Sequence, residues 1–158
     1  DYEYKRNGTA NVFVTVEPKG GYRTTRVTKR RTRKDFAQEL RRIISLPRYA
    51  GVRKIHLVCD NLNTHNERSI TETFGEKETA RIMKSVQFHY TPKHASWLNM
   101  AEVEIGIMSG QATQGRIGTK EKLSEQIRAW QKRRNRKRAT ITWTFTKKKA
   151  RLKFKYKC

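Results

Sequence analysis

Short runs of β-branched and apolar residues alternate along this chain with stretches whose apolar residues recur every three to four positions. The runs at Asn11–Glu17 and Tyr22–Thr28 are separated by a short Gly-containing segment, which predicts an antiparallel hairpin. A helical pattern at residues 32–46 follows, and further strand-like runs occupy residues 54–59 and Val86–Tyr90. This β-β-α-β order predicts an α/β domain in which helices flank a mixed sheet.

Three more regions have the composition or periodicity of helices, at residues 66–86, 97–108 and 119–138. Gly75 divides the first region into two short helices, because glycine disfavours a helix interior. Thr119 is a suitable N-cap for the last helix, on which Leu123, Ile127 and Trp130 share one face. With 158 residues, the chain is long enough for one domain with a hydrophobic core.

The hexamer DNLNTH, residues 60–65, follows the third strand-like run and is almost entirely polar. An aspartate directly after a strand is most often a turn or helix-capping residue. Asp60 would also suit a metal site at the tip of a strand, where it could be joined by the polar side chains of the same hexamer. From the residues alone, both interpretations stay open.

Two glutamates are candidates to complete such a site. Two-metal phosphoryl transfer needs carboxylates from separate elements that converge on one point, and Mg²⁺ is satisfied by two or three of them. Glu102 and Glu104 lie in the helical pattern after the fourth strand-like run. They are about 200° apart around a helix, so only one can face the site. Because a helical glutamate is more often simply solvated, the pattern alone predicts no more than a basic α/β nucleic-acid-binding domain.

The charge of the chain indicates a polyanionic partner. There are 37 Lys and Arg residues against 14 Asp and Glu, a formal net charge of +23. Cations that neutralise phosphates release condensed counterions, which favours binding to nucleic acid. A membrane surface fits less well, because the sequence has neither a clean amphipathic anchor nor a run of about 18 apolar residues.

The segment from Gln126 onward contains no acidic residue. We therefore divide the chain into residues 1–125 and a basic extension, residues 126–158. Aromatic residues are interleaved with the cations of this extension, a combination that suits backbone phosphates and base stacking. The cations that we expect to contact DNA are Arg133, Arg134, Arg136, Lys137 and Arg138. In the alternative interpretation, the aromatic residues dock the extension on the core and the cations face water.

The two cysteines, Cys59 and Cys158, give no disulfide framework, since one lies in an apolar run and the other at the last position. This usage is typical of a reducing compartment. With no signal peptide visible, it predicts a cytoplasmic protein.

Four blocks of sequence resemble the bacterial insertion-sequence transposases related to the mariner superfamily. In chain order they are DYEYKRNGTANVFV, DNLNTH, FHYTPKHASWLNMAEVE and RRNRKRATITWTFT. The resemblance implies a ribonuclease H-like fold with a DDE active site. Such enzymes cut DNA with water and join the freed 3′-hydroxyl to target DNA with Mg²⁺ or Mn²⁺. Transposition of two element ends implies a homodimer of the full-length protein.

The same resemblance implies roles for individual residues. Asp60 looks like the family's second acidic metal ligand and Glu102 like its third, because the family places its last acidic residue after a similar Leu-Asn pair. Glu104 is the alternative to Glu102. Lys93 and His94, in the loop before Glu102, would contact DNA. The residues that would orient the Asp60 carboxylate or touch a phosphate are Asn61, Asn63 and His65.

The sequence departs from that family in two places. The family's first catalytic aspartate lies on a strand upstream of the DYEYKRNGTAN block, so we expect this chain to lack that strand, its aspartate and the helix-turn-helix DNA reader before it. Asp1 precedes the second strand and is not the missing ligand. We therefore predict that residues 1–158 are inactive, or nearly so, by themselves. Gly106 and Gly110 fall where the helix of Glu102 should continue, and each costs about 1 kcal/mol there.

Two other functions are compatible with these residues. A non-catalytic nucleic-acid-binding protein would bind with a steep salt dependence that ignores Asp60 and Mg²⁺. A ribonuclease H-like nuclease such as a resolvase would share the fold. That second alternative is disfavoured, because the block HASWLNMAE resembles transposases specifically.

Overall fold

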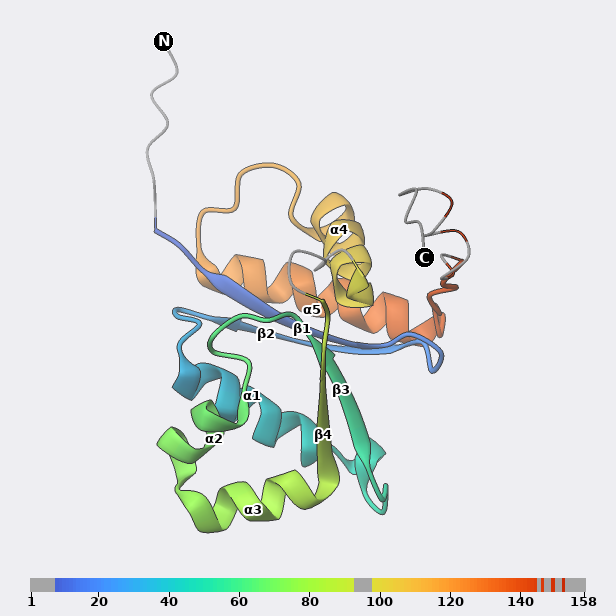
Figure 1. Cartoon of the computed structure of the whole chain (residues 1–158). Coiled ribbons are helices and arrows are strands. Elements are labelled where there is room, and N and C mark those ends of the chain that lie inside the picture. The colour runs from blue at the N-terminus through green and yellow to red at the C-terminus, as the bar shows by residue number, and fades with distance from the viewer. Residues whose placement is uncertain (1–7, 93–97, 145, 147–148, 150–151, 153–158) are drawn as a thin grey trace.

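The computed structural model describes residues 8–92, 98–144, 146, 149 and 152 (Figure 1). Strands and helices alternate as the sequence predicts, which confirms the mixed α/β class. In chain order the elements are β1 (Asn11–Glu17), β2 (Tyr22–Thr28), α1 (Arg33–Ile44), a 3-10 turn (Pro47–Tyr49), β3 (Ile55–Cys59), α2 (Glu67–Phe74), α3 (Glu76–Ser85), β4 (Val86–Tyr90), α4 (Met100–Ala112) and α5 (Lys120–Arg136).

β1 and β2 form an antiparallel hairpin in which Asn11 is opposite Thr28 and Glu17 is opposite Tyr22. Successive side chains of a strand point to opposite faces, so the hairpin has two surfaces to cover. In Figure 1, α4 and α5 lie on one side of the hairpin and α1, α2 and α3 lie on the other. The hairpin is therefore the layer that separates two groups of helices.

The turn of the hairpin is held against the end of α5. Gly21 N donates to Glu17 O at 2.9 Å, and Ile141 N donates to Pro18 O at 2.8 Å. Gly21 has a φ of +63°, and a Cβ at this position would lie 3.0 Å from Arg138 Cα and closer still to the Arg138 carbonyl. The turn thus needs glycine both for its backbone conformation and for the close approach of the two segments.

β3 and β4 form a parallel pair that ends at one edge. Cys59 is opposite Tyr90 in the register, and Thr91 N donates to Cys59 O at 3.0 Å. Parallel neighbours need a crossover connection, which α2 and α3 provide. Gly75 separates these two helices, as predicted. Asp60 and Thr91, the residues that follow the two strands, consequently lie at the same edge.

Two hydrophobic clusters hold the helices in place. The cluster beneath α1, α2 and α3 consists of Leu40, Ile70, Ile82 and Val86, all at most 2% exposed. The cluster under α4 and α5 consists of Met108, Ile127 and Trp130, with Val12, Val14 and Val27 of the hairpin packed against it. Burial of one such side chain contributes about 1.5–3 kcal/mol, so these faces fix where each helix docks.

α4 continues through both of its glycines. Asn99 caps the helix by accepting a hydrogen bond from Ala101 N at 3.1 Å, and the last residue is Ala112. A Cβ added at Gly106 or Gly110 would meet no atom within 4 Å. The two glycines therefore do not interrupt the helix, and nothing within the described chain approaches them closely.

The described strands form two separate sheets, β1–β2 and β3–β4, which are not hydrogen-bonded to each other. The mixed sheet, which we expected to lack its first strand, is thus divided into two pairs of strands in the part of the chain that the structure describes. The physical reason is that a sheet is continuous only where neighbouring strands exchange backbone hydrogen bonds, and no described strand joins the two pairs. Each pair is left with unpaired outer edges.

Among the helices described, none has the length and apolar character needed to cross a membrane.

Candidate active site

Asp60 lies at the tip of β3 and is fixed by His65. His65 Nδ1 donates to Asp60 Oδ1 at 2.7 Å, and Leu62 N lies 3.4 Å from the same oxygen. The His65 ring packs on the ring of Phe36 in α1, with centroids 4.7 Å apart. The Asp60 side chain is 34% exposed. One carboxylate is thus held in a defined orientation at the end of the parallel strands while solvent still reaches it.

The other polar residues of the hexamer shape the loop around this carboxylate. Asn61 Nδ2 donates to Thr91 O and so joins the segments that follow β3 and β4. Asn66 Nδ2 donates to Asn63 O at 2.8 Å, and Asn66 Oδ1 accepts from Ser69 N at 3.1 Å to cap α2. The helix cap is therefore Asn66, three residues beyond Asn63. That excludes the helix-capping interpretation of Asp60 and leaves its carboxylate to the loop and to solvent.

Cys59 packs beneath this loop. Its Sγ lies 4.0 Å from His65 O, and the residue is 7% exposed. Burial, and to a lesser extent the negative charge of Asp60, raises the pKa of the Cys59 thiol to about 11. The side chain is therefore a protonated packing group near neutral pH rather than a reactive thiolate.

The two helical glutamates lie on opposite sides of α4. Glu102 is in the first turn and exposed, whereas Glu104 is fully buried. Glu104 Oε1 lies 2.8 Å from Arg23 Nε, and Glu104 Oε2 lies 3.0 Å from Arg134 Nη2. Because two guanidinium groups already occupy its carboxylate, Glu104 is poorly suited to bind a metal ion. Glu102 is the glutamate that is free to do so.

The described residues do not by themselves make a two-metal centre. Within residues 8–92 and 98–144, no three His, Cys, Asp or Glu side chains gather closely enough to hold a metal ion. Asp60 offers oxygen ligands of the kind that Mg²⁺ prefers. Among the described residues, however, Asp60 does not belong to any group of three possible metal ligands. The roles assigned to Asp60 and Glu102 stay predictions.

The cations predicted to bind DNA differ in their surroundings. Arg133, Arg136, Lys137 and Arg138 are exposed at the end of α5 and just beyond it. Arg134 instead directs its guanidinium at buried Glu104, and its side chain is 19% exposed. Lys93 and His94 lie outside the described residues. α5 runs without interruption across residues 125 and 126, so the predicted domain boundary falls within a helix.

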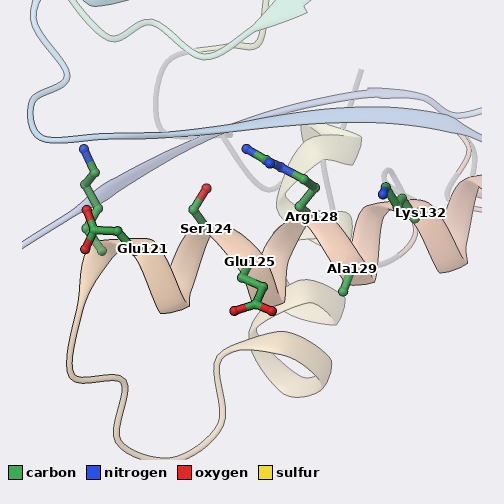
Figure 2. A pocket seen from close by; sticks show the side chains of 7 residues that line it. Glu121, Ser124, Glu125, Arg128, Ala129 and Lys132 are labelled. Atoms are coloured by element: carbon green, nitrogen blue, oxygen red, sulfur yellow. The ribbon is translucent and has the colours of Figure 1, made fainter.

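A groove runs along α5 (Figure 2). It has a volume of about 460 Å³. Its lining residues are Lys120, Glu121, Ser124, Glu125, Arg128, Ala129 and Lys132. Three cations and two carboxylates line it. This mixture weakens the groove as a site for an anion, because each carboxylate repels what the cations attract.

Sequence reasoning missed the residues that fix α4 and α5 against the hairpin. Arg23 is fully buried in β2, and its Nη2 donates to Ala139 O at 2.6 Å. Asn135 of α5 donates to Arg23 O at 2.8 Å and accepts from Arg23 N at 2.9 Å. The alternation of the strand could have indicated this, because Arg23, Thr25 and Val27 lie on the same face of β2 and that face points into the molecule. A charged residue at an inward position implies a buried partner.

Comparison with known proteins gives one family. The sequence model of a family described as DDE superfamily endonuclease matches residues 1–124. Neither the curated proteins nor the solved structures gave a match. The matched region runs through α4 and into the first turns of α5, so it contains Asp60, Glu102 and the parallel strands.

Proposed function

The chain belongs to the DDE superfamily endonucleases, and we propose that within this family it is part of a transposase from a bacterial insertion sequence related to the mariner superfamily. The family accounts for a DNA substrate, for nuclease or transposase chemistry and for the general use of divalent metal ions. The proposal adds the specific reaction, which is cleavage of DNA at element ends followed by transfer of the 3′-hydroxyl end to target DNA.

The observation that carries this proposal is the position of Asp60. Asp60 is the first residue after β3 and lies at the edge at which parallel β4 also ends, and His65 Nδ1 lies 2.7 Å from its Oδ1. Ligands of parallel strands gather at the carboxyl ends of those strands, where successive connections meet. Glu102 follows β4 in the chain and is exposed in the first turn of α4. The two carboxylates therefore come from consecutive connections of the parallel pair.

We assign Mg²⁺ or Mn²⁺ as the ion, with Asp60 and Glu102 among its ligands. These are oxygen donors, which such ions prefer over nitrogen and sulfur. The described residues lack the third acidic group, so we propose that another carboxylate, on a strand that would join β1–β2 to β3–β4, completes the centre. Residues 1–158 alone would then be inactive or nearly so. In the full-length protein we propose a homodimer that acts on DNA in the cytoplasm.

The test is cleavage and strand transfer by the full-length protein with Mg²⁺ or Mn²⁺. Asp60→Ala and Glu102→Gln should abolish cleavage while duplex binding without metal is retained. Glu67→Gln is the matched control, because Glu67 is an exposed acidic residue in the first turn of α2, just beyond the hexamer. Wild-type cleavage by Asp60→Ala would refute the assignment. Metal-dependent strand transfer by residues 1–158 alone would refute the predicted inactivity.

A second function is favoured by a different observation. The net charge of +23 fits a non-catalytic DNA-binding protein. That protein would bind duplexes of any sequence equally, and neither Mg²⁺ nor Asp60→Ala would alter binding. The cleavage assay separates the two functions, because only the first predicts product.

A further inference from the structure

A shallow groove between β2 and α1 is lined by cations without an acidic lining residue. Its volume is about 320 Å³. The lining residues are Arg26, Gln38, Arg41, Arg42 and Ser45. Unlike the groove along α5, it presents three guanidinium groups together with an amide, which are all able to donate hydrogen bonds, whereas the Ser45 hydroxyl already donates to Arg41 O at 2.8 Å.

A buried carboxylate beneath the groove positions two of these arginines. Glu39 is 3% exposed, and its Oε2 accepts from Arg42 Nε at 2.8 Å. Arg42 Nη2 also donates to Thr24 Oγ1 at 2.9 Å, and Arg26 Nη1 lies 3.6 Å from Glu39 Oε2. The Glu39 carboxylate raises the pKa of Arg42, which is permanently charged. The side chains of Arg26 and Arg42 keep 39% and 32% of their surface exposed, so solvent-facing donors are left over.

The third arginine is oriented by an aromatic ring. The Arg41 guanidinium carbon lies 4.2 Å from the ring centroid of Phe74 in α2. Stacking fixes the plane of a guanidinium and leaves its edge free to donate in a fork, the geometry that suits a phosphate. Two arginines held by a carboxylate and one held by a ring make a surface that loses little side-chain entropy when an anion binds.

The cationic surface continues beyond the groove toward the start of α1. Arg30, Arg31 and Lys34 are exposed, and none of them forms an ion pair with another described residue. Lys34, Gln38 and Arg41 follow one face of α1, because their spacings are four and three residues. The amides at the start of α1 are already capped by Thr32 and Asp35, so the side chains, rather than the helix end, would bind the anion.

We propose that this groove, lined by Arg26, Arg41 and Arg42, binds consecutive phosphates of a DNA backbone. Arginine forks recognise phosphate without reading bases, so the contact would position duplex DNA rather than select its sequence. The open groove and the adjoining cations fit a chain of phosphates better than one small anion. The choice of DNA rests on the proposed function, whereas the phosphate chemistry follows from the groove itself.

The experiment measures binding of a mixed-sequence duplex to residues 1–158, without divalent metal, as a function of salt concentration. The test variant is R26Q/R41Q, which keeps Arg42 on buried Glu39. Log affinity falls linearly with log salt concentration, and each lost phosphate contact makes this slope less steep by about 0.9. The slope of the double variant should therefore be less steep than that of the wild type by about 1.8. Between 50 and 200 mM salt, the loss of affinity should then be about tenfold smaller than in the wild type.

The matched control is R53Q/R116Q, which removes two exposed arginines that form no ion pair with another described residue. A slope for R26Q/R41Q equal to that of the control would overturn the proposal. If the double variant does not fold by circular dichroism, Arg41→Gln alone should lower the slope by about 0.9, and an unchanged slope would be equally decisive. Displacement of the duplex by inorganic phosphate at equal phosphate concentration would show a site for the free anion and would also overturn it.

These outcomes are independent of catalysis. A chain that cleaves no DNA but shows the slope change would refute the proposed reaction and keep the groove. A full-length protein that needs Asp60 for cleavage, while R26Q/R41Q binds like the control, would keep the reaction and remove the groove.

Discussion

Glu104 and Glu102 are two residues apart and have opposite environments. Glu104 is fully buried between Arg23 and Arg134, whereas Glu102 is exposed in the first turn of α4. Removing one partner of a buried ion pair leaves uncompensated charge, at a cost of about 3–5 kcal/mol. Glu104→Gln should therefore lower the free energy of unfolding by that amount, as measured by urea denaturation.

Glu102→Gln is the control for this change, since it alters the same helix by the same chemistry. An exposed substitution without a buried partner should change the free energy of unfolding by no more than about 0.5 kcal/mol. A larger loss of unfolding free energy for Glu102→Gln than for Glu104→Gln would mean that α4 is rotated so that Glu102, and not Glu104, is buried. The pair of variants thus separates the glutamate that holds the fold from the one proposed to hold metal.

Glu17 gives the fold a pH dependence with a definite sign. Arg48 Nε and Nη2 donate to its two oxygens at 2.6 and 2.7 Å, and Tyr49 Oη donates at 2.7 Å. The Arg48 hydrogen bonds hold the pKa of Glu17 below its ordinary value of 4.5, against the opposing effect of burial. A carboxyl whose pKa is lower when folded stabilises above its unfolded pKa, and this stabilisation is lost as pH falls through the folded pKa.

Glu17→Gln should accordingly be less stable than the wild type at pH 7, and the difference should shrink as pH falls below about 4.5. Urea denaturation at pH 7, 5 and 3.5 measures this. Glu67→Gln, which removes an exposed carboxylate that forms no ion pair with another described residue, serves as the control and should follow the wild type. A difference that grows on acidification would contradict the direction of the pKa shift.

At the scale of elements, local patterns were sufficient to predict most of the structure. β1, β2 and β4 have the predicted bounds because their β-branched runs end at glycine, proline or polar residues. α5 begins after Thr119, which accepts from Lys122 N at 3.1 Å as a predicted N-cap does. Strand ends and helix caps depend on a few neighbouring residues, so they can be predicted without knowledge of tertiary contacts.

The candidate site was less predictable, for a physical reason. Asp60 could be found because a strand end is a local signal. The pairing of Glu104 with Arg23 and the placing of Arg42 over Glu39 depend on which faces meet in space. Helical spacing showed that Glu102 and Glu104 face opposite ways, but only their contacts decide which of the two is free.

α4 offers a test of an element that tolerates unfavourable residues. Gly106 and Gly110 lie within the helix, and a Cβ at either position would meet no atom within 4 Å. Alanine should therefore add helix propensity without a clash, and each substitution should raise the free energy of unfolding by about 1 kcal/mol. Thermal and urea denaturation of Gly106→Ala and Gly110→Ala measure it, with Ser109→Ala as the exposed control. Destabilisation by both would show that another surface approaches the helix at these positions.

At the scale of the whole molecule, the two sheets are the feature that links fold to activity. β1–β2 and β3–β4 share no backbone hydrogen bonds, and each pair has unpaired outer edges. If one further strand joins β1 to β3, as we propose for the full-length protein, it would bring its own carboxylate to the tip of β3 beside Asp60. Completion of the sheet and completion of the metal centre would then be one event.

Amide hydrogen exchange tests this directly. Alternate amides of a strand point to opposite edges, so in residues 1–158 the outward amides of β1 and β3 should exchange rapidly while those directed at β2 and β4 are protected. In the full-length protein, the outward amides of β1 and β3 should become protected, whereas the outer edges of β2 and β4 should change little. Protection of these outward amides already in residues 1–158 would contradict the open edges. Unchanged exchange in the full-length protein would contradict the joining strand and, with it, the proposed source of the third carboxylate.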